Sequence, residues 1–91
     1  AEPAHEETPE RYVAAVETSR RVRRAIEALS PVHRDALVLR ELEDHSYDEI
    51  AAVVRCPVGT VMSRLHHARK KVADELLLSF GGPEELARHA A

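Results

Sequence analysis

With 91 residues, the chain suits one small domain with a single core, and its 44% apolar residues are almost all aliphatic. Few glycines and prolines interrupt a sequence rich in Ala, Leu, Glu and Arg, which favours helices over sheets. The single cysteine excludes an internal disulfide, and no apolar run approaches the ~20 residues of a membrane span. We expect an all-α, cytoplasmic domain with no membrane insertion. Because the only methionine is Met62, we expect a piece of a longer protein.

Charge is distributed unevenly along the chain. The formal net charge of −3 would by itself argue against a nucleic-acid partner. However, residues 1–10 carry glutamates and no Lys or Arg, whereas residues 55–71 carry five Lys or Arg and no acid. Contact with phosphate depends on the local patch rather than on the net charge. The sequence therefore allows a DNA-binding surface within residues 55–71.

The N-terminal part predicts an acidic linker followed by a long helix. Residues 1–8 are acidic, contain a proline and lack periodicity. Thr8-Pro9 is a helix-start signal, with Thr at the cap and Pro at the first helical position. We expect the first helix to run to about Leu29. Its predicted buried positions are Tyr12, Val16, Val22, Ile26 and Leu29.

Two shorter helices are predicted next. Ser30-Pro31 repeats the start signal, and the second helix should run to about Leu42. Ser46 and Glu49 have the spacing of a capping box that opens a third helix, which Pro57 should terminate. The expected inward positions are Val32, Ala36, Leu39 and Leu42 in the second helix, and Ile50, Ala51, Val53 and Val54 in the third.

The fourth predicted helix has the clearest periodicity in the chain and runs from about Val58 to Leu76 or beyond. A glycine pair before Pro83 breaks the tail at residues 79–91, where a short helix could follow the break. We expect a domain over residues 9–78, between the linker and this tail. The apolar stripe of the fourth helix consists of Val58, Val61, Leu65, Ala68, Val72 and Leu76.

The third and fourth helices together predict a helix-turn-helix. A short capped helix, a three-residue turn and a longer amphipathic helix form this unit, whose second helix enters the major groove. The predicted fold is an all-α four-helix domain with a C-terminal helix-turn-helix and no winged element. A polar face of a surface helix is common, but here the face is free of acids and follows a proline turn. It holds Gly59, Thr60, Ser63, His66, His67, Lys70 and Lys71, with Arg64 on one flank.

The sequence resembles region 4 of bacterial sigma-70-type factors, and is most similar to the extracytoplasmic-function group. The most specific motif is Cys56-Pro-Val-Gly-Thr-Val-Met-Ser-Arg-Leu-His-His-Ala-Arg69, which shares Val-Gly-Thr-Val, Ser-Arg and Ala-Arg with the family. Leu29-Ser-Pro31 also fits the family pattern. The resemblance covers about residues 9–76, most of the chain.

The resemblance implies that the domain docks on the flap of core RNA polymerase and reads the −35 promoter element in double-stranded DNA. It also implies that an anti-sigma factor covers this surface. By position, Arg40 and Tyr47 would meet phosphates, while the residues of the fourth helix would face bases and adjacent backbone. The implied DNA-binding set is Arg40, Tyr47, Gly59, Thr60, Met62, Ser63, Arg64, His66, His67, Lys70 and Lys71.

Two positions depart from the family pattern. Family members often have Lys or Arg at the position of Met62 and Arg at the position of His67. Each lost phosphate contact should lower the salt dependence of DNA binding by about 0.9 in log–log slope. We therefore expect a target sequence different from that of the best-known members.

Other kinds of site have weak support. Cys56 has histidines as potential co-ligands but no second thiolate, so we predict no metal and a packed turn residue. No catalytic constellation or phosphate-binding loop is present, so we predict no enzyme activity and no cofactor. The arginines of residues 20–24 fit a solvated face that pairs with the acidic linker better than they fit a polymerase or DNA contact.

Two alternative functions stay open on the sequence. The output domain of a response regulator also has four helices, but its recognition helix normally begins with a Lys-Thr-Val-Lys type of motif. A sigma-like adaptor that binds polymerase or an anti-sigma factor without reading DNA would fit the negative net charge and the missing cations at Met62 and His67. Salt-dependent DNA binding distinguishes the adaptor from the two DNA-reading classes.

Overall fold

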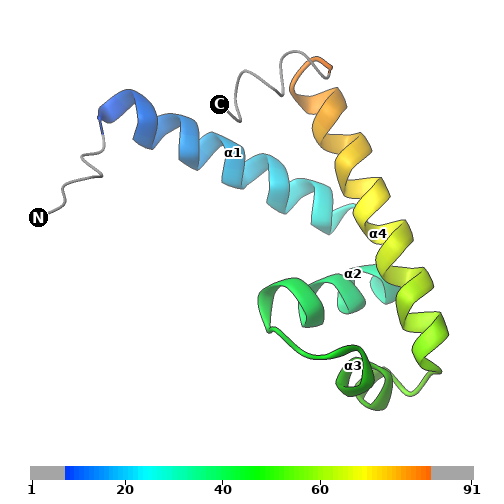
Figure 1. Cartoon of the computed structure of the whole chain (residues 1–91). Helices are drawn as coiled ribbons and strands as arrows, with labels where there is room; N and C mark the ends of the chain where they lie inside the picture. The colour runs from blue at the N-terminus through cyan, green and yellow to red at the C-terminus, as the bar shows by residue number, and fades with distance from the viewer. Residues whose placement is uncertain (1–7, 83–91) are drawn as a thin grey trace, which may run out of the picture.

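The computed structural model describes residues 8–82, and all regular structure in this range is helical (Figure 1). The predicted all-α class and helix-turn-helix are confirmed. The linker of residues 1–7 and the predicted tail helix after Gly82 lie outside the described residues. No helix between residues 8 and 82 is long and apolar enough to cross a membrane. The elements are α1 (Pro9–Glu27), α2 (Pro31–Leu37), the π-helix η1 (Val38–Leu42), α3 (Tyr47–Val54) and α4 (Val58–Ser79).

The helix starts follow the predicted capping signals. The Thr8 hydroxyl accepts a hydrogen bond from the Arg11 N–H at 3.2 Å. At α3 the capping box is complete, because the Ser46 N–H donates to Glu49 Oε1 at 2.8 Å and the Glu49 N–H donates to Ser46 Oγ at 3.1 Å. Pro57 is the N-cap of α4 in an extended conformation. Local sequence therefore fixes where three of the helices begin.

The core lies where α2, α3 and α4 meet. The three largest fully buried side chains are Ile50 of α3 and Val61 and Leu65 of α4, each no more than 1% exposed. Partly buried residues surround them, and Cys56 is one of these, as predicted. The buried cluster comprises Leu29, Ala36, Leu37, Ile50, Val61, Leu65 and Ala68.

The second predicted helix does not stay α-helical to its end. It changes at Val38 into a π-helix, whose wider turn is closed by the Glu43 N–H donating to the Val38 carbonyl at 3.0 Å. A π-turn takes more residues than an α-turn, so the 3.6-residue stripe no longer predicts which side chains face inward. Leu39 still packs against the core, but Leu42 is 69% exposed, and its prediction as an inward residue was wrong.

Three further residues predicted to be buried are exposed. Tyr12 lies in the N-terminal half of α1, which extends away from α2 and α3 (Figure 1) and so has no core to pack against there. Val32 in the first turn of α2 and Val53 in α3 border a shared surface hollow. Helical periodicity identifies an apolar side but not how much of it a neighbouring element covers.

Arg21 joins α1 to the end of α4. Its guanidinium carbon lies 4.5 Å from the centre of the Phe80 ring, and its Nη1 donates to the Ser79 carbonyl at 2.6 Å. Its Nε also pairs with Glu17 at 3.3 Å within α1. Phe80 is 4% exposed. Arg21 is therefore a structural residue that connects two helices, a role that neither interpretation of the arginine cluster predicted.

The turn between α3 and α4 contains a strained residue, and relieving the strain should stabilise the domain. Arg55 ends α3 in the left-handed region, at φ 60 and ψ 53. This conformation costs a non-glycine residue roughly 1 to 2 kcal/mol. Glycine avoids that cost, but the greater conformational entropy of its unfolded chain offsets part of the gain in stability. Arg55→Gly should therefore raise the free energy of unfolding by about 0.5 to 1 kcal/mol in urea denaturation.

Arg55→Ala is the matched control, because alanine removes the same side chain without relieving the backbone. Asp44, at φ 59, offers a second comparison. Aspartate tolerates the left-handed region better than arginine, so Asp44→Gly should stabilise less than Arg55→Gly. Equal unfolding free energies for Arg55→Gly and Arg55→Ala would contradict the strain argument.

Candidate nucleic-acid interface

Helices α3 and α4 form a tightly connected helix-turn-helix. The capping box fixes the start of α3, Arg55 turns the chain and Pro57 starts α4. Ile50, Val61 and Leu65 then lock the two helices together through fully buried side chains. The first turns of α4 are therefore held rigidly, as a helix that reads base edges requires.

Most predicted recognition residues lie on one exposed face of α4. Thr60 and Arg64 are half-buried at its edges, and Arg64 borders the hollow that Val32 and Val53 also line. A Cβ added to Gly59 would meet no other atom within 4 Å, so the fold itself does not require glycine there. This is consistent with close approach of the backbone to a ligand. The exposed residues are Gly59, Met62, Ser63, His66, His67, Lys70 and Lys71.

The cations at the far end of this face are only weakly paired. Lys70 Nζ lies 3.1 Å from Asp74 Oδ2, and Lys71 Nζ lies 3.9 Å from Glu75 Oε2. Both lysine side chains remain more than half exposed. Solvent-exposed pairs of this i,i+4 type are each worth only about 0.3 to 0.5 kcal/mol. A phosphate could therefore displace these carboxylates at small cost.

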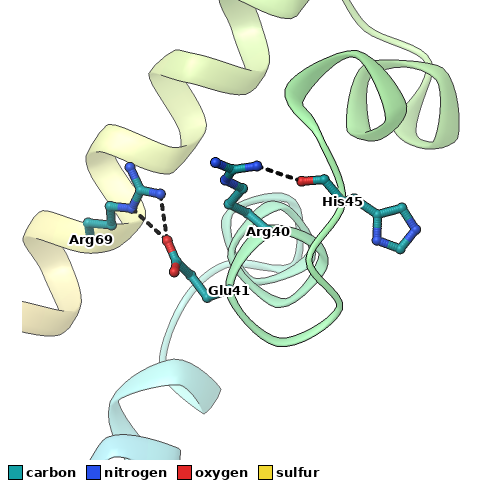
Figure 2. A network of polar contacts seen from close by, with 4 residues as sticks. All are labelled: Arg40, Glu41, His45 and Arg69. Atoms are coloured by element: carbon teal, nitrogen blue, oxygen red, sulfur yellow. Dashed lines mark hydrogen bonds and ion pairs between the residues drawn. The ribbon is translucent and has the colours of Figure 1, made fainter.

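Arg40 and Tyr47, both predicted to meet phosphates, lie side by side. The Arg40 guanidinium carbon lies 4.8 Å from the centre of the Tyr47 ring, and Arg40 Nη1 donates to the His45 carbonyl at 2.9 Å (Figure 2). Both side chains are half-buried, and Tyr47 packs against the core. Arg40 thus holds the loop before α3 in place, while a guanidinium has further N–H donors that could reach a phosphate.

Beside this pair, an ion pair connects η1 to α4 (Figure 2). Arg69 Nε donates to Glu41 Oε2 at 3.0 Å, and Arg69 Nη2 donates to the same oxygen. The hydrogen bond with Glu41 outweighs partial desolvation and raises the pKa of Arg69, and Tyr47 acts in the same direction. Arg69 therefore stays charged wherever the protein is folded, and the contact holds α4 against the π-helix.

Sequence reasoning did not identify Glu41 or Arg69 as positioning residues. They are 28 positions apart, and no periodicity relates residues of two different helices. The only sequence signals for this pair were an acid, Glu41, immediately after Arg40 and the arginine of the Ala-Arg motif, Arg69. Their pairing depends on the π-helix, which local propensity did not predict either.

A separate apolar groove lies between α1, η1 and α4. It has a volume of about 350 Å³ and is lined by apolar side chains, with Glu41 and Arg69 as its charged residues. Leu42, turned outward by the π-helix, also lines it. The lining includes Val22, Ile26, Leu37, Val38, Val72, Ala73 and Leu76. Its apolar character contrasts with the polar face of α4 and suits an apolar peptide segment rather than DNA.

Comparison with known proteins identifies the family. The family model for sigma-70, region 4 matches residues 19–72, which contain α2, η1, α3 and most of α4. The chain belongs to this family. Its relatives include the ECF RNA polymerase sigma-E factors of Escherichia coli K12 and Salmonella typhimurium LT2, each 44% identical over 68 residues. The RNA polymerase sigma-H factor of Pseudomonas aeruginosa is 46% identical over 66 residues.

The sigma-70 region 4 domain corresponds to only a part of these relatives. The matches cover 75% of this chain but 36% of the sigma-E factors, and 72% of this chain but 34% of the sigma-H factor. The family assignment favours a sigma factor over a response-regulator output domain. Within residues 8–82, no group of three or more His, Cys, Asp or Glu is arranged to hold a metal ion.

Proposed function

We propose that this region 4 domain recognises the −35 promoter element as part of an alternative sigma factor that binds core RNA polymerase. The observation that carries the proposal is the exposed, acid-free face of α4 from Gly59 to Lys71, rigidly mounted on a helix-turn-helix. Ser63 and Thr60 offer small hydrogen-bonding groups early in the helix, and cations follow later. This order suits a helix that enters the major groove with its N-terminal end.

Supporting contacts come from outside α4. Arg40 and Tyr47 lie together beside the start of α3, where they would contact the phosphate backbone and fix the register of α4 in the groove. The Glu41–Arg69 pair would act indirectly, by holding α4 against η1. The protein contributes binding and positioning here, and we assign no chemical reaction to it.

The test is selection of binding sites from a randomised duplex library, followed by affinity measurements over a range of salt concentrations. We expect one short motif to be enriched and the affinity for it to fall steeply with salt. If the Ser63 hydroxyl contacts a base, Ser63→Ala should reduce the discrimination between bases at that one position by about 1 to 3 kcal/mol of binding free energy. Gly59→Ala should leave the fold as stable or more stable, yet weaken binding, because the backbone could no longer approach the DNA closely.

Arg11→Gln is the matched control for loss of polar or charged groups. Arg11 lies in the exposed first turn of α1, which points away from α3 and α4 (Figure 1). Its removal should leave the selected motif and the affinity unchanged. Weak binding with no enriched motif would instead favour the adaptor function, in which the domain binds polymerase or an anti-sigma factor without reading DNA.

For the polymerase side, we infer that the apolar groove between α1, η1 and α4 receives an apolar segment of the polymerase flap. The lining of the groove supports this, because it is almost wholly apolar and includes the exposed Leu42. The groove and the recognition face involve different sides of α4, since Val72 and Leu76 line the first while Ser63 and His67 belong to the second. One domain could therefore hold polymerase and DNA at the same time.

A further inference from the structure

A cluster of histidines lies at the edge of the recognition face, where the start of α2 meets the middle of α4. The rings of His33 and His67 are 6.1 Å apart, centre to centre, with their planes at 89°, and His66 lies 5.5 Å from His67. Beside them is a hollow of about 530 Å³. Polar groups in its lining come from Ser30, the N-cap of α2, from His33 in α2, and from four residues of α4: His67, Lys70, Lys71 and Asp74.

His33 is held in a defined orientation. Its Nδ1 lies 2.5 Å from the Ser30 hydroxyl oxygen. When that hydroxyl donates to Nδ1, a neutral ring carries its proton on Nε2. Within residues 8–82, Nε2 of His33 has no hydrogen-bond partner. In that tautomer the ring presents an Nε2–H donor, and the contact with Ser30 fixes its direction.

The surroundings of the pair favour an anion. The hollow is lined from α4 by His67, Lys70 and Lys71, and from the start of α2 by Ser30 and His33. His66 lies beside His67. Asp74 is the single acid in the lining, and it is already paired with Lys70 at 3.1 Å. A phosphodiester group would bring a negative charge into this hollow and accept hydrogen bonds from its donors.

We propose that the hollow formed by Ser30, His33, His67 and Lys70 binds a phosphate of the DNA backbone next to the base pairs that α4 reads. This inference rests on the proposed function, which it extends from α4 to the start of α2. His67 belongs to both surfaces, so a strand that follows the recognition face past His67 reaches His33 next. The start of α2 thereby becomes a second support for the position of the duplex.

The experiment identifies which phosphate lies in the hollow by neutralising the phosphates of the duplex one at a time. The probe is a duplex that carries the motif selected from the library, together with versions in which one phosphate at a time is replaced by an uncharged methylphosphonate. For the unmodified protein, neutralising the phosphate in the hollow should weaken binding about threefold to tenfold, as expected for loss of one hydrogen bond. In His33→Asn the same methylphosphonate should weaken binding less than it does for the unmodified protein, because only the other groups of the hollow still contact that phosphate.

Two variants of His33 distinguish loss of the Nε2 donor from a general effect of the substitution on folding. His33→Asn places an amide oxygen near the Nδ1 position, where it can accept from the Ser30 hydroxyl, but has no donor at the Nε2 position, so it should weaken duplex binding about threefold to tenfold. His33→Gln places an amide donor near the Nε2 position and should retain most of the affinity at pH 8.

The outcomes distinguish this site from the proposed function. If the unmodified protein selects and binds a motif but every methylphosphonate has the same effect on His33→Asn as on the unmodified protein, the phosphate site is overturned and promoter reading stands. Equal losses in His33→Asn and His33→Gln at pH 8, with unchanged thermal stability, would also overturn it. If the unmodified protein binds no duplex, the proposed function and the phosphate site both fall.

Discussion

Ile50→Ala should unfold the helix-turn-helix at temperatures where the unmodified domain is stable. Ile50 is 0% exposed and packs in the cluster with Val61 and Leu65, so its truncation leaves a cavity that the surrounding helices cannot fill. Such substitutions cost about 2 to 5 kcal/mol. Whole proteins have only roughly 5 to 15 kcal/mol of stability. Thermal unfolding followed by circular dichroism should show a Tm lowered by at least about 10 °C.

Val53→Ala is the control within the same helix. Val53 is 58% exposed, so its truncation removes a similar side chain without opening a cavity, and the Tm should change little. The comparison tests whether α3 is held by burial at Ile50 rather than by helix propensity, since both changes introduce alanine into α3. A free energy of unfolding reduced equally by the two changes would contradict this account.

The features that were predictable from sequence are those specified by neighbouring residues. Thr8-Pro9, the Ser46–Glu49 capping box and Pro57 located helix starts because their effect acts within one turn of helix. The stripe through Val61 and Leu65 identified the buried side of α4 for a similar reason. The recognition face followed directly, because it lies opposite that stripe.

The features that could not be predicted depend on contacts between distant residues. The π-helix turned Leu42 outward and brought Glu41 to Arg69, and nothing local in residues 38–42 indicates a wider turn. Arg21 reaches Ser79 across 58 positions. His33 and His67 meet only because α2 packs on α4. The candidate site was thus predicted along α4 and, by resemblance, at Arg40 and Tyr47, while the contributions of His33 and Glu41 required the tertiary structure.

The π-helix also leads to the second large expected effect, which concerns polymerase binding. Leu42→Gln should weaken binding of the domain to the polymerase flap at least tenfold, as expected when an apolar side chain central to an interface is replaced. Because Leu42 is 69% exposed in the domain alone, the free energy of unfolding should change by no more than about 0.5 kcal/mol. Glutamine is uncharged, so the adjacent Glu41–Arg69 pair should be preserved.

Leu78→Gln provides the matched control. Leu78 is 78% exposed near the end of α4 and does not line the groove, so the same substitution there should leave flap binding unchanged. Binding is measured by titrating purified flap domain, and DNA affinity is measured in parallel. Because the groove and the recognition face occupy different sides of α4, Leu42→Gln should leave DNA affinity intact. Equal flap binding by the two variants would show that the polymerase docks elsewhere, and a parallel loss of DNA binding would show that the two surfaces are not independent.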